Sequence, residues 1–210
     1  MLSVESCSNA ACGAWIGGLA NLWRTTGDIQ ATWRSVLSNL DQNNQMAQFA
    51  GPGHFNDADM LQVGDAGLSP DEARSHFAAW CVIATPLLIS NDLVSGIDAA
   101  TIEILTAPEV IAVSQDVLGV QGVRVSPSAP TAGECWAKPL ADGSVAVLFL
   151  NRGDATADVT CSFVEMGLPH PDASAQLRDL WARADLPAAT GSYTAAALRS
   201  HASALIKFTQ

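Results

Sequence analysis

The stretches Leu22-Trp-Arg-Thr-Thr-Gly-Asp-Ile29 and Gly51-Pro-Gly-His-Phe-Asn-Asp-Ala-Asp-Met-Leu61 decide how this chain is expected to fold. Each contains a short apolar segment of strand length that ends in charged or amide side chains. The first places Arg24 and Asp28 on one short segment, and the second gathers three such residues at the end of its strand. In α/β barrels the functional side chains gather at the carboxyl ends of parallel strands, so these residues are expected to share one rim.

Strand and helix patterns alternate around these stretches up to about residue 115. Strands are expected at 2–5, 20–24, 55–60 and 87–90, and helices at 30–40, 69–84, 98–105 and 108–113. In the first helix, Trp33, Val36, Leu37 and Leu40 recur at helical spacing. The second opens with Ser69-Pro-Asp-Glu72, which combines a cap residue, proline at the first helical position and acids in the first turn. Four consecutive strand-then-helix units predict the second half of an eight-stranded α/β barrel.

The pattern changes after residues 118–122 to short strands separated by turn residues. Strands are expected at 135–139, 145–151, 157–163, 175–179, 193–198 and 204–208. Asp142-Gly143 and Arg152-Gly-Asp154 are hairpin-turn signals. The segment Ser126-Pro-Ser-Ala-Pro-Thr131 is expected to be a loop inside this region. The sequence therefore predicts an α/β plus all-β chain, in which residues 1–119 hold the last four strands of a (β/α)8 barrel and residues 120–210 form an antiparallel β-sandwich.

Composition narrows the class of protein. The chain has 210 residues, of which 49% are hydrophobic, enough to build the core of one ordinary domain or two small ones. Its net charge of -11, with ten Lys and Arg, argues against a nucleic-acid partner, because phosphate binding needs cationic side chains. The longest apolar run, 77–89, is too short for a bilayer span and contains Pro86. No secretory leader is visible in the sequence, so the compartment is unknown from this chain.

The cysteines do not have the spacing of a zinc ribbon. They are Cys7, Cys12, Cys81, Cys135 and Cys161. Cys7 and Cys12 are close enough in sequence to close a small disulfide loop. Cys81 lies in an apolar helical run and is expected to be a buried thiol.

Six motifs together resemble the α-galactosidase (melibiase) family of retaining glycosidases, glycoside hydrolase family 27. Besides the two opening stretches, they are Arg74-Ser-His-Phe-Ala-Ala-Trp80, Ala84-Thr-Pro-Leu-Leu-Ile-Ser-Asn-Asp92, Glu109-Val-Ile-Ala-Val-Ser-Gln-Asp116 and Leu118-Gly-Val-Gln-Gly122. The resemblance implies a (β/α)8 catalytic barrel followed by a C-terminal β-sandwich. It also implies hydrolysis of terminal α-D-galactosyl residues in oligosaccharides or polysaccharides, no metal or organic cofactor, and an extracellular or secreted location.

By this resemblance Asp28 is the acid/base of a retaining mechanism, which needs two carboxyl groups roughly 5 Å apart. A carboxyl that must be protonated when substrate arrives needs a raised pKa, from burial or from a nearby like charge. The alternative is that Asp28 caps the helix expected from about residue 30. Arg24 is implied to bind a sugar hydroxyl, for which a guanidinium offers two aligned donors. A surface ion pair is the alternative for Arg24.

Glu5, Asp59 and Met60 are also implied to bind substrate. Glu5 stands where the family places a carboxylate that accepts a hydrogen bond from a sugar hydroxyl, which favours galactose over N-acetylgalactosamine. Asp59 and Met60 resemble the pair in which the acid binds a hydroxyl and the thioether lines the pocket. Residues 6–12 depart from the Glu-Trp pattern of many relatives. A glycosidase acting on β-L-arabinopyranosides or α-N-acetylgalactosaminides is therefore an alternative.

A metal site is considered at Asn56, Asp57 and Asp59, whose oxygens suit Mg²⁺ or Ca²⁺. Neighbouring positions on a strand alternate in direction and cannot all face one ion, so no metal is expected and Asp57 is predicted to be a structural hydrogen-bond acceptor. For the same reason Trp23, next to Arg24, is expected to pack beneath the site. The four histidines show no ligand spacing, and each is expected to be structural: His54, His76, His170 and His201.

The family's nucleophilic Asp has no counterpart among these residues, so we expect a fragment of a longer enzyme that is inactive by itself. A half-barrel also leaves strand edges unclosed, which costs stability. Two alternatives stay open. One is a non-catalytic carbohydrate-binding or interaction module, and the other is a half-barrel completed by a separate chain or by a second copy of itself.

Overall fold

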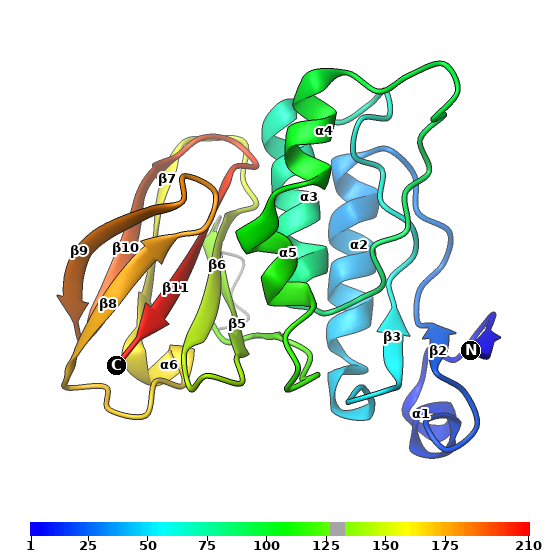
Figure 1. Cartoon of the computed structure of the whole chain (residues 1–210), viewed down its shortest axis with the longest axis horizontal. Coiled ribbons are helices and arrows are strands. Elements are labelled where there is room, and N and C mark those ends of the chain that lie inside the picture. The colour runs from blue at the N-terminus through cyan, green and yellow to red at the C-terminus, as the bar shows by residue number, and fades with distance from the viewer. Residues whose placement is uncertain (127–132) are drawn as a thin grey trace.

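The computed structural model of this chain describes residues 1–126 and 133–210. Figure 1 shows short parallel strands at one end of the molecule, antiparallel strands at the other, and a layer of helices between them. The predicted loop 126–131 lies outside the described residues, except for Ser126.

The N-terminal strands form a parallel sheet in the order β1 (Ser3–Val4), β2 (Leu22–Arg24) and β3 (Phe55–Asp57). Each strand is shorter than predicted. β3 ends before Asp59 because that residue has a φ of 80°, a left-handed conformation that extended backbone does not allow. The fourth expected strand, 87–90, makes only an isolated parallel bridge between Leu61 and Ile89. Just before it stands Pro86, which has no N–H to donate to a strand ladder.

The helices of this part are α1 (Ala10–Ile16), α2 (Trp33–Asn44), α3 (Pro70–Val82), α4 (Ala99–Leu105) and α5 (Pro108–Ser114), with a short 3-10 turn, η1 (Ala47–Phe49). The last four helices were predicted, and α1 was not. α2 starts three residues later than expected because the Thr32 side chain accepts a hydrogen bond from the backbone of Ser35 and so caps the helix there. α3 opens with a complete capping box between Ser69 and Glu72, as its sequence indicated.

The C-terminal part is a β-sandwich, as predicted. Its larger sheet has the order β4 (Val123–Arg124), β5 (Gly133–Pro139), β6 (Val145–Asn151), β11 (Ser203–Thr209), β8 (Ser174–Asp179) and β9 (Ala184–Thr190), with antiparallel pairing throughout. The smaller sheet pairs β7 (Ala157–Ser162) with β10 (Ser192–Leu198). The expected extension of β7 to Phe163 is wrong, because Ser162 caps a short helix, α6 (Phe163–Met166).

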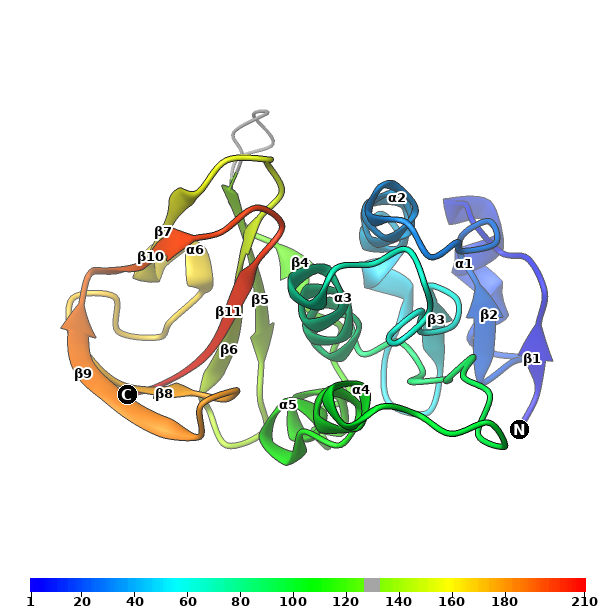
Figure 2. The same ribbon diagram turned by 90° about the horizontal axis from the view of Figure 1, so that it is seen from above.

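The larger sheet is covered on both faces, and this fixes the helical layer to the sandwich. One face packs against the smaller sheet around Phe149, Phe163 and Phe208. The other packs against α3, so that Trp80 and Leu148 belong to a single apolar core. Every residue of β6 is buried as a result. Figure 2 shows α3 lying directly against this sheet. In the described ranges, no helix is long and apolar enough to cross a membrane.

An ion network ties α2 to the sandwich. The Arg152 guanidinium binds both carboxylate oxygens of Asp41, at 2.9 and 2.7 Å, and both of Glu134, at 3.0 and 3.1 Å. Arg124 lies at 3.4 Å from the same two acids. The Glu134 side chain is only 8% exposed and also accepts a hydrogen bond from Trp136. The network therefore lies partly out of water, where charge pairs are stronger than at an open surface.

Candidate active site

Arg24, the last residue of β2, is the centre of the candidate site. Its Nη2 lies 2.9 Å from Asp59 Oδ2 and 3.1 Å from Asp28 Oδ1. The Arg24 side chain is 15% exposed, whereas that of its partner Asp28 is 92% exposed. The Arg24 Nε is buried and has no hydrogen-bond partner among the described residues. A buried donor left without a partner is costly, so this atom is an exception to the usual pairing of buried polar groups.

Asp59 is held on every side. Its backbone N–H donates to Asp57 Oδ1 at 2.8 Å, and its carbonyl accepts from the Trp80 indole at 2.8 Å. One carboxylate oxygen accepts from the Ile29 N–H at 2.7 Å and the other from the Met60 N–H at 2.8 Å. These bonds keep Asp59 in its left-handed conformation and join the loop after β2 to the loop after β3. The Arg24–Asp59 pair is therefore preorganised.

Asp57, like Asp59, is a buried acid of the site. Burial raises its pKa, and the like charges of Asp59 and Glu5 act in the same direction, although the backbone of Asp59 and the Arg24 charge oppose them. The prediction that Asp57 is a hydrogen-bond acceptor is confirmed by its bond from the Asp59 N–H. Its burial and raised pKa were not foreseen. Among the described residues, no group of His, Cys, Asp and Glu could hold a metal ion.

Asp28 and the two remaining predicted residues lie on the open side of the site. The Asp28 side chain is 92% exposed, so it lacks the burial that was one of the two features expected of an acid/base here. Asp28 does not cap α2, whose cap is Thr32, so that alternative is wrong. Glu5 is exposed just after β1, and its charge reaches Asp57. Met60 is 36% exposed beside Asp59.

Helix α2 supports the loop after β2 through Asn39 and Asn43. The Asn39 amide donates to Thr26 Oγ1 at 3.1 Å, to the Gly27 carbonyl at 3.1 Å and to the Ala58 carbonyl at 3.0 Å. The Asn43 amide donates to the Thr25 hydroxyl at 2.9 Å. These asparagines were missed at the sequence level. The available signal was two amides four residues apart on the buried face of a helix, a spacing that places them on one side.

Beneath the site, Trp23 is fully buried, which confirms the prediction that it packs below rather than onto a ligand. Its indole donates to Asn56 Oδ1 at 2.7 Å. The Asn56 amide donates to the Met46 carbonyl and to Gln121 Oε1, at 2.7 and 2.9 Å. The Gln121 amide in turn donates to Asn43 Oδ1 at 2.7 Å. Asn56 is thus fully occupied by structural hydrogen bonds, which argues against its being a metal ligand.

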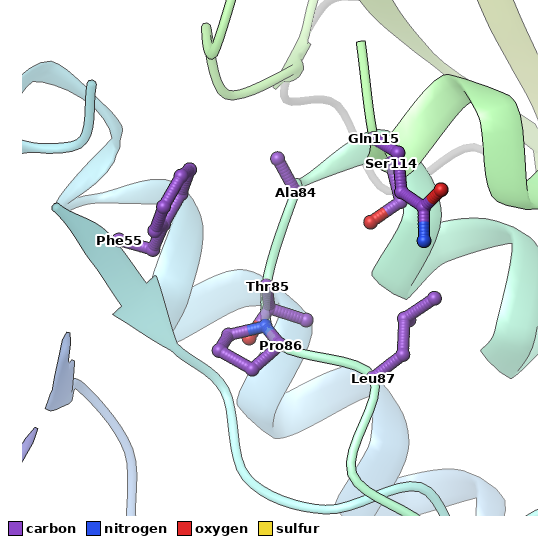
Figure 3. A pocket seen from close by; sticks show the side chains of 7 residues that line it. All are labelled: Phe55, Ala84, Thr85, Pro86, Leu87, Ser114 and Gln115. Atoms are coloured by element: carbon purple, nitrogen blue, oxygen red, sulfur yellow. The ribbon is translucent and has the colours of Figure 1, made fainter. Parts of the chain in front are cut away.

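A cavity of about 430 Å³ lies between the start of β3, the segment after α3 and the end of α5. Figure 3 shows its lining residues, Phe55, Ala84, Thr85, Pro86, Leu87, Ser114 and Gln115. Phe55 is the first residue of β3, whereas the candidate site begins at the last residue of that strand. The cavity therefore lies at the opposite end of the sheet. It contains none of the five residues assigned to the site from the sequence.

Two histidines confirm the expected structural role with particular clarity. His76 is fully buried, accepts a hydrogen bond from the Gln62 N–H at 3.0 Å, and has its pKa lowered to about 3 by burial. His201 binds Glu72 through Nδ1 at 2.6 Å and stacks on Trp33 with ring centroids 5.0 Å apart. Both side chains join elements of the fold rather than face the candidate site.

The cysteine expectations are also confirmed. Cys7 and Cys12 form a disulfide with their Cα atoms 5.5 Å apart. It joins the segment after β1 to the first turns of α1, which are packed around Trp23 and Met46. Cys81 is a buried free thiol in α3.

Comparison with known proteins gives two family matches. The family described as Alpha galactosidase A matches residues 8–116, and the family described as Alpha galactosidase C-terminal beta sandwich domain matches residues 131–208. Alpha-galactosidase 2 of Arabidopsis thaliana is 47% identical over 167 residues, which are 80% of this chain and 41% of that protein. The chain spans less than half the length of this relative and of the rice and Cyamopsis tetragonoloba α-galactosidases that it also matches.

Two solved structures share the fold. The crystal structure of α-galactosidase I from Mortierella vinacea is 28% identical with a TM-score of 0.86, and the match covers 93% of this chain and 55% of the other. A β-L-arabinopyranosidase from Geobacillus stearothermophilus is 25% identical with a TM-score of 0.89, covering all of this chain and 50% of the other. The resemblance inferred from the motifs is thereby confirmed.

Proposed function

The chain belongs to the α-galactosidase family, and we propose that it carries the acid/base side of the sugar site in a retaining glycoside hydrolase that releases terminal α-D-galactosyl residues. The observation that carries this proposal is Arg24, a mostly buried guanidinium held between Asp28 and Asp59. A rigid guanidinium, which presents its donors in one plane, suits the adjacent hydroxyls of a sugar.

In this proposal Arg24 and Asp59 bind and orient the sugar. The Asp59 carboxylate is fixed by two backbone N–H groups and still has lone pairs that can accept from a hydroxyl. The Arg24 guanidinium, whose side chain is 15% exposed, donates to a ligand oxygen. Glu5 accepts from a further hydroxyl, and Met60 gives an apolar contact at the rim.

Asp28 acts as the acid/base. As the glycosidic bond breaks, its carboxyl gives a proton to the leaving oxygen, and it then takes a proton from the water that hydrolyses the intermediate. The Arg24 contact at 3.1 Å holds the Asp28 carboxyl beside the sugar. We place the attacking carboxylate on a segment outside these 210 residues, a proposal supported by the 41% coverage of the Arabidopsis relative. Such a segment would also cover Asp28 and partly exclude water from it.

The substrate proposed is an α-galactoside oligosaccharide or polysaccharide. A β-L-arabinopyranoside is the alternative favoured by a specific observation, since one of the matched structures is a β-L-arabinopyranosidase. This sugar differs from galactose by lacking the exocyclic CH₂OH group, so discrimination depends on side chains near that group. Export to an oxidising compartment is proposed on the strength of the Cys7–Cys12 disulfide.

The test measures sugar binding and hydrolysis separately. Galactose and arabinose are titrated by NMR into the purified chain, into Arg24→Met and into Arg34→Met, a matched change of an exposed arginine on α2. We expect weak galactose binding that Arg24→Met abolishes and Arg34→Met preserves. Equal binding by the two variants, or no binding by the native chain, would overturn the assignment of the site.

Hydrolysis of an aryl α-galactoside tests the second part of the proposal. We expect no turnover by the chain alone, because the attacking carboxylate is placed elsewhere. Turnover that disappears in Asp28→Asn would instead put the nucleophile within these residues. Turnover that survives Asp28→Asn would refute the role assigned to Asp28.

A further inference from the structure

Two free thiols face each other inside the β-sandwich. Cys135 on β5 and Cys161 on β7 are both buried and belong to the same apolar core. The Cys135 sulfur lies 3.7 Å from the carbonyl oxygen of Thr160, the residue next to Cys161. Strands β5 and β7, which carry the two thiols, pack against each other. They come from different sheets, so they form a point of contact across the interior of the sandwich.

The registers of the two sheets place these thiols in one layer. Cys135 is paired with Phe149 on β6, and Cys161 is paired with Tyr193 on β10. Phe149 and Tyr193 meet edge to face across the sandwich with ring centroids 5.4 Å apart. Strands β5 and β7 pack directly against each other, and Figure 2 shows the small sheet facing the large one. The aromatic pair and the thiol pair are therefore neighbouring contacts of the same interface.

We propose that Cys135 and Cys161 are a dithiol site that reacts with a small-molecule disulfide, such as oxidised glutathione, to form a disulfide between the two sheets. One protein thiolate attacks the oxidant, forms a mixed disulfide and releases one glutathione thiolate. The second protein thiolate attacks the protein sulfur of that mixed disulfide and releases the other. Two cysteine thiols are oxidised, one glutathione disulfide is reduced to two thiols, and the two protein protons pass through solvent to the glutathione thiolates.

The reaction is slow while the sandwich is closed. The pKa of the Cys135 thiol is raised well above its ordinary value by the hydrogen bond with Cys161, by burial and by the charges of Glu165 and Glu134, so little thiolate is present. Opening can begin at β7, because among the described residues this strand belongs to a sheet of two strands and pairs with β10 alone. Separation of that sheet exposes Cys161 first. Oxidation should therefore speed up under conditions that loosen the sandwich without unfolding it.

Cys81 provides an internal control within the same chain. It is also a buried free thiol, but it lies in α3 and belongs to the other core. Among the described residues, no other cysteine belongs to that core. The proposed pair therefore predicts that oxidation consumes two of the three free thiols and spares the third.

The test counts thiols in the native chain by alkylation in denaturant, before and after incubation with oxidised glutathione a few degrees below the thermal midpoint. We expect three alkylated cysteines before and one after, with a peptide map that joins Cys135 to Cys161. The oxidised chain should unfold at a higher temperature by several degrees, because the new link restricts the unfolded chain. Three alkylated cysteines after prolonged incubation, or stable glutathione adducts without the cross-link, would overturn the proposal.

Two variants secure the assignment. Cys81→Ala should still lose both of its remaining alkylation sites, at the rate seen for the native chain. Cys161→Ala should keep Cys135 free or carry it only as a mixed disulfide. A cross-link between Cys135 and Cys81 in that variant would show that proximity across the sandwich does not decide the pairing.

Discussion

Replacing Arg152 with methionine should weaken the attachment of α2 to the sandwich. Methionine keeps much of the apolar stem but removes the guanidinium that bridges Asp41 and Glu134. Glu134 would lose its two short charged hydrogen bonds while its side chain stays 8% exposed. Breaking a fully buried pair in this way costs roughly 3–5 kcal/mol.

Two features reduce that cost. Arg124 remains 3.4 Å from Glu134, and Asp41, with a side chain 37% exposed, can be hydrated. We therefore expect Arg152→Met to lower the free energy of unfolding by about 2–3 kcal/mol. With a urea dependence of about 2–3 kcal/mol per molar, typical of the upper range for single domains, the midpoint should fall by about 1 M.

The assay is urea unfolding followed by tryptophan fluorescence, with Arg34→Met as the matched surface control. The control should change the free energy of unfolding by less than about 0.5 kcal/mol. Combining Arg152→Met with Asp41→Asn should give a coupling energy of about 1 kcal/mol. The reasoning is refuted if Arg152→Met behaves like the control or if the double variant is additive.

Two further outcomes follow from a buried histidine and from a glycine whose backbone lies close to a neighbouring carbonyl group. Burial lowers the pKa of His76 from 6.5 to about 3, so between these pH values the unfolded chain binds a proton that the folded chain does not. The free energy of unfolding should therefore decline by up to about 1.4 kcal/mol per pH unit as the pH falls from about 6 to 3. His76→Gln keeps an acceptor for the Gln62 N–H and should flatten this slope when unfolding is measured as a function of pH. An unchanged slope would contradict the assignment of this pH dependence to His76. Gly67 has a φ of 126°, and a Cβ there would overlap the Ala31 carbonyl oxygen. Gly67→Ala should therefore lower the free energy of unfolding, measured by thermal unfolding, by roughly 2–3 kcal/mol. The control Gly53→Ala, whose Cβ meets open space, should lower it by about 1 kcal/mol. Equal losses of stability in the two variants would show that the overlap at Gly67 is relieved.

Most strands of the sandwich could be predicted because their sequences are short apolar runs or alternate between apolar and polar residues. Strand β6, for example, was placed from 145 to 151, the bounds that the structure shows. Strand β9 was missed because most of its residues are exposed and it contains Pro187, so the sequence carries little periodic signal there. Helix α1 was missed because it is a short run of small residues, capped by Asn9 and joined to Cys7 by the disulfide. Its position depends on tertiary contacts that local pattern does not encode.

The candidate site was predictable in its chemistry and only partly in its support. Arg24, Asp28 and Asp59 were singled out from their motifs, and the structure brings them within hydrogen-bond distance. The three hydrogen bonds of the Asn39 amide were not predictable, since they depend on where two loops place their carbonyl groups. The buried state of Asp57 was missed for a similar reason, because exposure at a strand end is decided by the loops that cover it.

The amides behind the site have a consequence for which ligands it can accept. Asn39, Asn43, Asn56 and Gln121 hold the loops without adding charge, so the electric field at the rim is set by the groups in front of them. There one guanidinium stands among the carboxyl groups of Glu5, Asp28, Asp57 and Asp59. These carboxylates would repel a sulfated sugar or a uronic acid, and added salt would weaken that repulsion by screening the charges. The binding of a neutral sugar should not depend on ionic strength. We therefore expect the rim to disfavour anionic glycans before any shape-selective contact is made.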